Sequence, residues 1–519
     1  MASRTINILY VSYTGRDKMI GIMQSKSFLQ GHGFVIPQYF INNPDQPVFD
    51  HTPYWPPGYP LLLAPFLKLF NFQIYNATTV FDIIVGLALI FIIRRICRQI
   101  GFPKAAINIM TLVTGCFEYT FISDSLPTDA VALLFLLIAV TYFINIAGNE
   151  KTPVTRLLLA SFLLVLPNFF RYAYPAVSVG IPLLLMLSGI FLKEKKKVRQ
   201  GAILLAGVLC FLGLFFLYMR STTGLFNYSL PTERGLYPEN LLHWQPVVPA
   251  SFINMAFLGS QLFRHWGIGT GTMMSFLEII NILALIGILA IFIRWFRARD
   301  FFKNLNPLRW FLLTGFVISM TVFLSLGYLS LTYANQNTQN GGWNYVYESR
   351  YYAFIFIFLQ VCFVAILFRA KWQKKWYTLI PVVIAALMLC AEITHNLYFN
   401  TKLAFSFQTY KSAVYREQDY QYLADLIRDT KAINPGLGIM TAGYHDDYFA
   451  YRGTYEGGKG IADPLRLNEQ LPKVKRKTVL FLMIYDKDKD QFASFLKNNP
   501  VKELKQFDFC RFYSLELDP

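Results

Sequence analysis

Charged residues are scarce in this chain of 519 residues, since Asp, Glu, Lys and Arg together make up only 15% of it. Soluble domains usually carry about 25%, so the composition excludes an ordinary soluble protein. Apolar runs of about 20 residues, long enough to cross a hydrocarbon core of ~30 Å, recur along most of the chain. We predict an α-helical multi-pass membrane protein with about 10–11 transmembrane helices. The clear spans begin near Tyr75, Ala105, Asp129, Thr155, Arg171, Gly201, Met273, Arg309, Tyr351 and Tyr377.

Cysteine is also sparse, and several common signatures are missing. The six cysteines are scattered without metal-type spacing or a disulfide framework. There is no P-loop, no Rossmann glycine pattern and no metalloprotease motif, which argues against nucleotide-dependent and zinc-protease chemistry. We find no clear internal repeat, so an inverted-repeat transporter has no obvious support.

The formal net charge is nevertheless +17. The positions of the basic residues along the chain indicate what this charge means. Basic clusters alternate with the spans, as the positive-inside rule predicts for cytoplasmic loops. The complementary loops, at 15–56, 123–128, 220–270 and 332–350, are therefore predicted outside, together with everything after about residue 400. The charge indicates membrane topology and not a nucleic-acid partner.

The chain is predicted to have two domains. Residues 1–400 form the transmembrane domain, and the more polar residues 401–519 form a small extracytoplasmic α/β domain. Ile6 to Tyr13 is apolar but far short of a ~20-residue span, so we expect a start further upstream or a shortened first helix. In the second domain, periodicity predicts helices at 415–432 and 488–497 and strands at 437–442, 478–485 and 507–517.

Two short patterns lie in the first predicted external loop. Asp17 is followed by a stretch predicted as a short amphipathic helix and by the glycine turn Gly31-His32-Gly33. Further on, the sequence from Pro56 to Pro60 (Pro-Pro-Gly-Tyr-Pro) leads directly into a predicted apolar helix. This pattern indicates a point where a polar loop folds back onto the bilayer. Alone, Asp17 could also be a solvated loop acid paired with Arg16 or Lys18.

Two further motifs follow, Asp129 at the start of a later span and Arg350-Tyr351 before another. The order of these motifs after Asp17 and the Pro56–Pro60 turn resembles that of the GT-C glycosyltransferases over residues 15–400. The closest likeness is to bacterial relatives of the protein-mannosyltransferase and aminoarabinose-transferase group. The resemblance implies a membrane enzyme that moves a sugar, such as mannose or another hexose, from a polyprenyl-phosphate donor to an extracytoplasmic lipid, glycan or protein. The missing nucleotide signature agrees with a lipid-linked donor. The shortened first helix and the C-terminal domain differ from the family pattern.

The resemblance makes Asp17 the catalytic base. An acceptor hydroxyl, whose pKa lies far above neutral, must lose its proton as it attacks the anomeric carbon. The leaving lipid phosphate is already a stable anion, so one carboxylate is sufficient for an inverting single displacement.

Two further acids, Asp124 and Asp129, lie in and after the second external loop. The resemblance implies that they position substrates or share a divalent cation with Asp17. A set of carboxylates without histidine suits Mg²⁺ or Mn²⁺, although the sequence requires no cofactor. Asp129 could equally be a helix-dipole partner beside Thr128 as N-cap.

The phosphate needs cationic partners, and Arg171 is a candidate because a charge inside an apolar stretch is expensive to bury. Arg350, with Tyr351, is the second, since a guanidinium can grip two phosphate oxygens; it could instead pair with Glu348 or snorkel to the interface. Lys26 is a weaker candidate.

His51 and Trp55 could line the sugar pocket, or Tyr54, Trp55 and Tyr59 could form an interfacial aromatic belt. Two other functions stay open. A polysaccharide polymerase or ligase would use the 220–270 loop with His243, Arg264 and His265, and a transporter or flippase for a lipid-linked glycan would need charges deep in several spans. In each case the protein is expected in the cytoplasmic membrane.

Overall fold

The computed structural model describes residues 5, 8, 16–40, 43–51, 56–116, 127–149, 151–224, 286, 290, 293, 305–332, 352–369, 383, 390, 393–394, 397, 413–443, 454–455, 467–468, 471–486, 489–507 and 510–519. Contacts divide the chain into two compact units. The helical unit comprises Met1–Asn7, Ile84–Ser123 and Asp129–Phe405. The mixed unit comprises Ile8–Ile83, Asp124–Thr128 and Ser406–Pro519. The predicted domain boundary at residue 400 stays a prediction.

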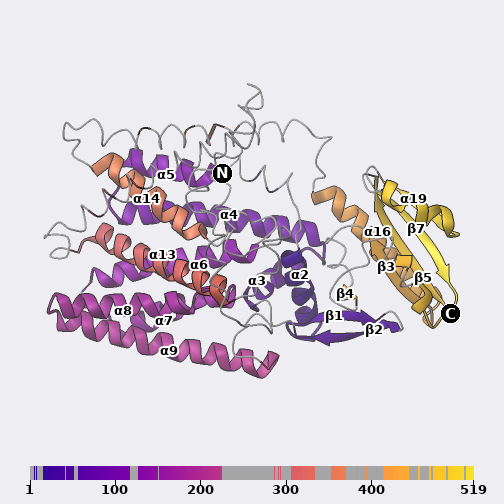
Figure 1. The fold of residues 1–519 in the computed structure, drawn as a ribbon, viewed down its shortest axis with the longest axis horizontal. Helices are drawn as coiled ribbons and strands as arrows, with labels where there is room; N and C mark the ends of the chain where they lie inside the picture. The colour runs from indigo at the N-terminus through magenta and orange to yellow at the C-terminus, as the bar shows by residue number, and fades with distance from the viewer. Residues whose placement is uncertain are drawn as a thin grey trace. The chain divides into compact units, whose positions relative to one another are not determined.

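The helical unit consists of apolar helices, as the sequence predicts. A helix lies at each predicted span except those near Met273 and Tyr377, which fall outside the described residues. Helix α8 packs on α9 and α13, and α9 also packs on α7 (Figure 1). The bounds of the apolar helices are α4 (Ile74–Gln99), α5 (Lys104–Cys116), α6 (Pro127–Ala147), α7 (Val154–Val165), α8 (Pro175–Phe191), α9 (Lys195–Thr223), α13 (Pro307–Thr332) and α14 (Ala353–Arg369). Residues 74–83 of α4 and 127–128 of α6 belong to the mixed unit.

Within the described residues, three helical segments are long and apolar enough to cross a membrane: Thr128–Ala147, Lys195–Thr223 and Pro307–Tyr328. Others are shorter, such as Val154–Phe169 and Pro175–Phe191. Between α7 and α8 lies a 3₁₀ turn, Leu166–Phe169, which contains Pro167, a residue type that interrupts α-helices. An α-helical membrane protein with a small C-terminal α/β domain is therefore confirmed as the fold class.

Small residues bring the helices of this unit close together. A Cβ atom on Gly207 would lie 2.5 Å from the Ser161 hydroxyl oxygen, and that hydroxyl donates to the carbonyl of Leu204 at 3.0 Å. On α13, a Cβ on Gly315 would overlap the ring of Phe358. Close approach at small residues is typical of helices that pack in a membrane.

The mixed unit joins the N-terminal segment that was predicted as the first external loop to the C-terminal part of the chain. Its N-terminal half holds α2 (Arg16–Leu29), α3 (Gly58–Leu69) and the antiparallel strands β1 (Ile36–Phe40) and β2 (Asn43–Asp50). Strand β4 (Thr454–Tyr455) pairs in parallel with β1. Gly31 and Gly33 have φ of +86° and +84°, so the predicted glycine turn is confirmed and needs glycine at both positions.

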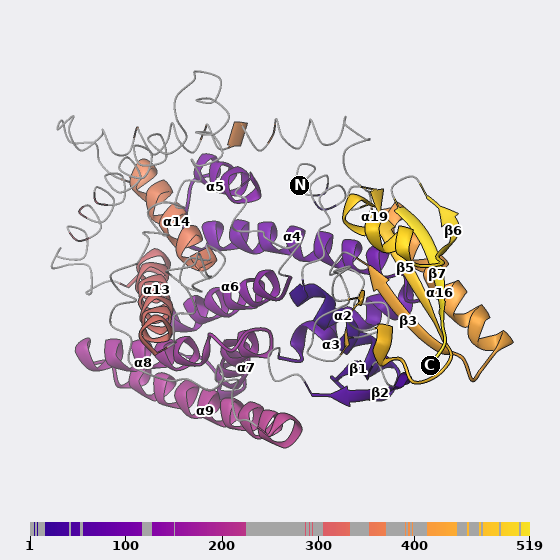
Figure 2. The same cartoon turned by 45° about the vertical axis from the view of Figure 1, so that its right-hand side comes forward.

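The C-terminal half of the mixed unit is an α/β fold close to the predicted one (Figure 2). Its sheet has the order β3-β5-β7-β6, with β3 parallel to β5 and the other pairs antiparallel. Strand β6 was not predicted, because its sequence Lys-Glu-Leu-Lys-Gln is an exposed, charged edge without apolar alternation. The bounds are α16 (Ala413–Ile433), β3 (Gly438–Gly443), β5 (Thr478–Tyr485), α19 (Lys489–Asn498), β6 (Lys502–Gln506) and β7 (Cys510–Leu517).

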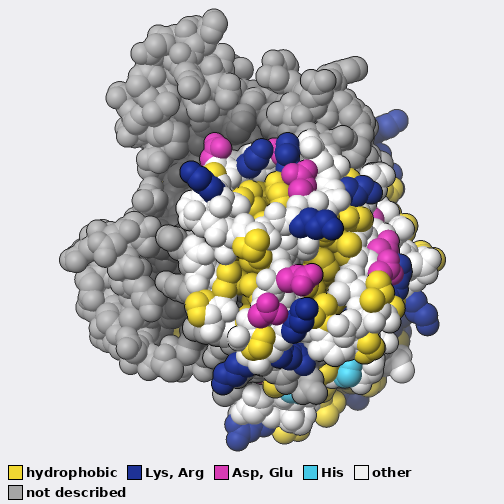
Figure 3. All heavy atoms as spheres, turned by 90° about the vertical axis from the view of Figure 1, so that its right-hand side faces the viewer, with side chains coloured by type: hydrophobic (Ala, Val, Ile, Leu, Met, Phe, Trp, Pro, Cys, Tyr) yellow, Lys and Arg dark blue, Asp and Glu magenta, His cyan; other side chains and the backbone are white. Residues whose placement is uncertain are grey.

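Both faces of this sheet are covered by a helix. Alternate residues of β5 enter two separate hydrophobic clusters, Leu480 with Phe492 of α19 on one face and Phe481 with Leu423 of α16 on the other. This explains why all eight residues of β5 are buried and why it reads as a continuous apolar run. On the face seen in Figure 3, basic and acidic side chains are interspersed with apolar ones, a mixture typical of a surface that faces water.

Candidate functional site

Helix α2 places Asp17 in its first turn, where the side chain lies outside what the structure describes. Residues 18–25 of the same helix are all buried. The prediction of an amphipathic helix here was wrong, because α2 is enclosed by its contacts with α3, α4 and β1. A catalytic base on such a helix would be held by packing on several sides.

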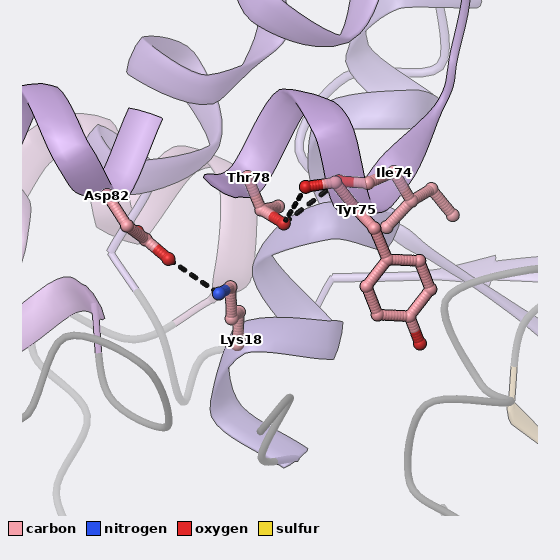
Figure 4. A network of polar contacts seen from close by, with 5 residues as sticks. All are labelled: Lys18, Ile74, Tyr75, Thr78 and Asp82. Carbon is pink, nitrogen blue, oxygen red and sulfur yellow. Dashed lines mark hydrogen bonds and ion pairs between the residues drawn. The ribbon is translucent and has the colours of Figure 1, made fainter. Parts of the chain in front are cut away.

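Lys18, the neighbour of Asp17, makes a buried ion pair with Asp82 of α4. Its ammonium nitrogen lies 2.6 Å from the Asp82 carboxylate, and each side chain is only 2% exposed (Figure 4). A buried charge is tolerated only when it is paired. Lys18 is therefore tied to α4, in contrast to the alternative in which Asp17 and Lys18 lie in a solvated loop.

Helices α2 and α3 also contact each other directly, partly through hydrogen bonds from a side chain to backbone carbonyls. The Ser25 hydroxyl donates to the carbonyls of Gly21 at 2.7 Å and Pro60 at 3.0 Å. A Cβ atom on Gly21 would lie 2.6 Å from Cε1 of the Tyr59 ring. Tyr59 is fully buried, so it packs inside the protein and is not part of an interfacial belt. The Pro-Pro-Gly-Tyr-Pro turn thus starts α3 and supplies contacts with α2 through Tyr59 and Pro60.

Two predicted binding residues lie near these elements. Lys26, on the last turn of α2, is half-buried, and burial of its ammonium group lowers its pKa to about 8. His51 is exposed directly after β2. Trp55 lies outside the described residues, so its place beside the sugar stays a prediction.

In the helical unit, Asp129 and Arg171 pair with each other. The Arg171 Nε donates to one Asp129 oxygen at 2.5 Å and an Nη to the other, which makes a bidentate contact. Asp129 is in the first turn of α6, and Arg171 precedes α8. Their side chains are 15% and 11% exposed. The sequence assigned these residues separate roles, and their pairing was not predicted.

Other predicted residues lie outside the described part of the chain: Asp124, Arg350 and Tyr351, together with His243, Arg264 and His265 of the 220–270 loop. Their roles remain predictions. Within the described ranges, no three His, Cys, Asp or Glu side chains come together as a metal site. Both Asp129 oxygens accept from Arg171, and the predicted Mg²⁺ or Mn²⁺ stays a prediction.

Sequence reasoning missed Glu417 of α16. Its carboxylate accepts the backbone N–H groups of Ile74 at 3.1 Å, Tyr75 at 2.6 Å and Asn76 at 3.3 Å. Burial raises the pKa of Glu417, and the three N–H bonds oppose that rise. Nothing local marks this residue, because its partners lie more than 340 positions earlier in the chain.

We compared the chain with known proteins. No protein-family model and no curated protein matches it. Among solved structures, apo ArnT from Cupriavidus metallidurans aligns with a TM-score of 0.50 and 10% identity, covering 99% of this chain and 95% of ArnT. The chain shares its fold with ArnT. This likeness concerns the fold alone, and it agrees with the multi-pass helical fold that the sequence predicts.

Two further structures were found at lower scores. ArnT bound to undecaprenyl phosphate aligns with a TM-score of 0.46 at 10% identity, covering 98% of this chain and 96% of ArnT. The archaeal oligosaccharyltransferase AglB from Archaeoglobus fulgidus, in complex with an inhibitory peptide and a dolichol-phosphate, aligns at 0.47 and 9% identity. That alignment covers 94% of this chain and 69% of AglB. Identities this low bear on the fold alone.

Proposed function

We propose that this protein is a GT-C glycosyltransferase of the cytoplasmic membrane that takes a sugar, such as mannose or another hexose, from a polyprenyl-phosphate donor. The acceptor, a lipid, glycan or protein, and the C-terminal domain would both be extracytoplasmic. The observation that carries the proposal is the fold shared with ArnT over nearly the whole of both chains. ArnT binds undecaprenyl phosphate, and we extend that chemical class of ligand to this chain.

Asp17 is the proposed base. The acceptor hydroxyl gives its proton to the Asp17 carboxylate while its oxygen forms a bond to the anomeric carbon. The bond from that carbon to the phosphate oxygen breaks, and the lipid phosphate leaves with the electron pair. Inversion at the anomeric carbon follows from a single displacement. Support comes from the buried helix that carries Asp17, because a base must be held in position to contribute its full effect.

Arg171 is a proposed phosphate partner. Guanidinium has five N–H donors, and the contact with Asp129 uses two of them. We propose that the same guanidinium also contacts phosphate oxygens of the donor, while Asp129 orients it. Lys26, Arg350 and Tyr351 are proposed to assist in donor binding, and Asp124, His51 and Trp55 in placing the sugar or acceptor. We assign no step to a divalent cation.

The test is transfer of radiolabelled sugar from synthetic polyprenyl-phosphate donors by purified protein, wild type beside Asp17→Asn. We expect loss of at least about 10²-fold in kcat without the base, with donor binding retained. Asp50→Asn, which alters an exposed acid at the end of β2, is the matched control and should be fully active. Turnover of no lipid donor by the wild type, or full activity of Asp17→Asn, would contradict the proposal.

A further inference from the structure

The N-terminus of α4 is held by a residue from the far end of the sequence. Glu417 of α16 accepts three consecutive N–H groups, those of Ile74, Tyr75 and Asn76, and is only 7% exposed. The first N–H groups of a helix have no partner within the helix, and a carboxylate there also interacts favourably with the helix dipole. The C-terminal domain therefore supplies the cap of α4.

Tyr75 strengthens this attachment. It is 1% exposed and belongs to the same hydrophobic cluster as Leu423 of α16, Ile439 of β3 and Phe481 of β5. The first turn of α4 is thus part of the core of the C-terminal α/β fold, as well as being capped by it. Residues up to Ile83 accordingly belong to the same compact unit as Ser406–Pro519.

The same stretch of α4 reaches the helix that carries Asp17. Ile74, Thr78 and Asp82 are spaced four residues apart and so lie on one face. The Thr78 hydroxyl donates to the Ile74 carbonyl at 2.9 Å, and Asp82 pairs with Lys18 one turn further on (Figure 4). Asp82 is eight residues beyond Ile74, a rise of about 12 Å along the helix. All of these residues belong to the mixed unit.

We propose that Glu417 is a positioning residue for sugar transfer, acting through α4: its cap fixes the start of the helix, Asp82 then fixes Lys18, and Lys18 sets the place of Asp17 on α2. The inference rests on the proposed function of Asp17. Glu417 needs no contact with either substrate. The C-terminal domain is accordingly a part of the catalytic apparatus and not an appendage.

A purely local cap is the competing explanation. In that case loss of the Glu417 charge would loosen the first turn of α4 and lower stability, while α2 and the chemical step remained as they are. The two explanations differ in whether the effect reaches α2, and that difference can be measured without any knowledge of the substrate.

The experiment compares wild type, Glu417→Gln and the control Asp429→Asn, an exposed acid on the same helix. Hydrogen–deuterium exchange is followed in peptides covering residues 16–29 and 74–83, and kcat and donor Kd are measured alongside. For Glu417→Gln we expect faster exchange in both peptides, a donor Kd within about twofold of wild type and a kcat lower by about 10- to 100-fold. Asp429→Asn should match the wild type throughout.

The double variant Glu417→Gln/Asp82→Asn sharpens the result. If both residues act through α4, the fold-loss in kcat of the double variant will be smaller than the product of the fold-losses of the two single variants. Faster exchange in 74–83 with unchanged exchange in 16–29 and unchanged kcat would overturn the inference, as would equal losses in kcat and donor affinity. If Glu417→Gln does not fold, Glu417→Asp, which keeps the charge and shortens its reach, takes its place.

The outcomes also separate this inference from the proposed function. A wild type that transfers no sugar would refute the proposed function, and the exchange rates in residues 16–29 would still show whether Glu417 controls the position of α2. Transfer that depends on Asp17 but is unaffected by Glu417→Gln would refute only the inference.

Discussion

Among the described residues, the ion pairs Lys18–Asp82 and Arg171–Asp129 differ in burial and geometry. Lys18 and Asp82 are each 2% exposed and meet through one contact of 2.6 Å. Arg171 and Asp129 are 11% and 15% exposed and meet through two. A fully enclosed Lys–Asp pair has no free side for a ligand, so it suits the positioning of helices. A partly exposed guanidinium suits an anionic ligand. The exposure of an ion pair therefore guides the role that we propose for it.

The largest expected effect comes from breaking the enclosed pair on one side. Lys18→Met leaves Asp82 buried without its counter-charge, and we expect a loss of about 3–5 kcal/mol in unfolding free energy. Lys477→Met is the control, because the Lys477–Glu516 pair is 61% and 78% exposed and 3.7 Å long; it should have little effect. Thermal unfolding in detergent gives both values. Equal stability of the two variants would show that the Lys18–Asp82 pair does not contribute to the free energy of unfolding.

Replacing both members tests the positioning role. Lys18→Met/Asp82→Leu substitutes apolar groups of similar volume and should restore most of the stability, as for other buried pairs. We expect its kcat to stay below that of wild type, since the tie between α2 and α4 is lost. Recovery of both stability and kcat would reduce the pair to a packing element.

The partly open pair is tested by Arg171→Lys, which keeps the charge and loses the planar fork. We expect the KM for the polyprenyl-phosphate donor to rise by about tenfold, or ~1.4 kcal/mol, because an ammonium lacks the planar fork of donors that makes the bidentate contact with Asp129. Steady-state transfer assays measure it. Arg428→Lys, at an exposed pair on α16, should leave KM unchanged; an unchanged KM in Arg171→Lys would remove Arg171 from donor binding.

A smaller effect is expected from the contact between α2 and α3. Gly21→Ala places a Cβ against the buried Tyr59 ring, and overpacking of this kind usually costs about 1–3 kcal/mol. Gly213→Ala on α9 is the control, because nothing lies within 4 Å of its added Cβ. Thermal midpoints should fall for Gly21→Ala and stay or rise slightly for Gly213→Ala. The opposite order would mean that α2 is not tightly locked.

The smallest effect concerns pH. The pKa of Lys26 falls from 10.5 to about 8 on folding, so between these values the unfolded chain binds more protons than the folded one. Burial of the Lys26 ammonium group therefore lowers the free energy of unfolding progressively as pH falls from 10.5 to about 8. This loss is recovered as pH rises toward 10.5. Lys26→Met should therefore have a higher thermal midpoint than wild type at pH 7. The difference between the two midpoints should be smaller at pH 9.5. A gap that is constant with pH would contradict the burial of the ammonium group.

Much of the fold could be predicted from the sequence, because it depends on local pattern. Apolar length placed the helices, and alternation or continuous apolar runs placed β3, β5 and β7. The strands β1 and β2 were missed because β2 contains Pro44 and Pro47, which argue against a strand by propensity. They are tolerated because β2 lies at the edge of its sheet.

The candidate site was less predictable. Asp17, Asp129 and Arg171 could be singled out as charges in or beside apolar segments, and the glycine turn could be placed by its spacing. Their partners could not, because Asp82 lies 64 residues from Lys18 and Arg171 lies 42 from Asp129. Glu417 had no signal at all, since a cap supplied by another element follows only from tertiary structure.

Binding of undecaprenyl phosphate tests the different roles of the two pairs most directly. Its Kd would be measured for wild type, Arg171→Gln and Lys18→Met/Asp82→Leu by titration of the purified proteins. The account predicts a Kd at least about tenfold weaker for Arg171→Gln, and one within about twofold of wild type for the double variant, in line with the loss or retention of a phosphate partner. Wild-type affinity in Arg171→Gln, or an equal loss in both variants, would contradict it.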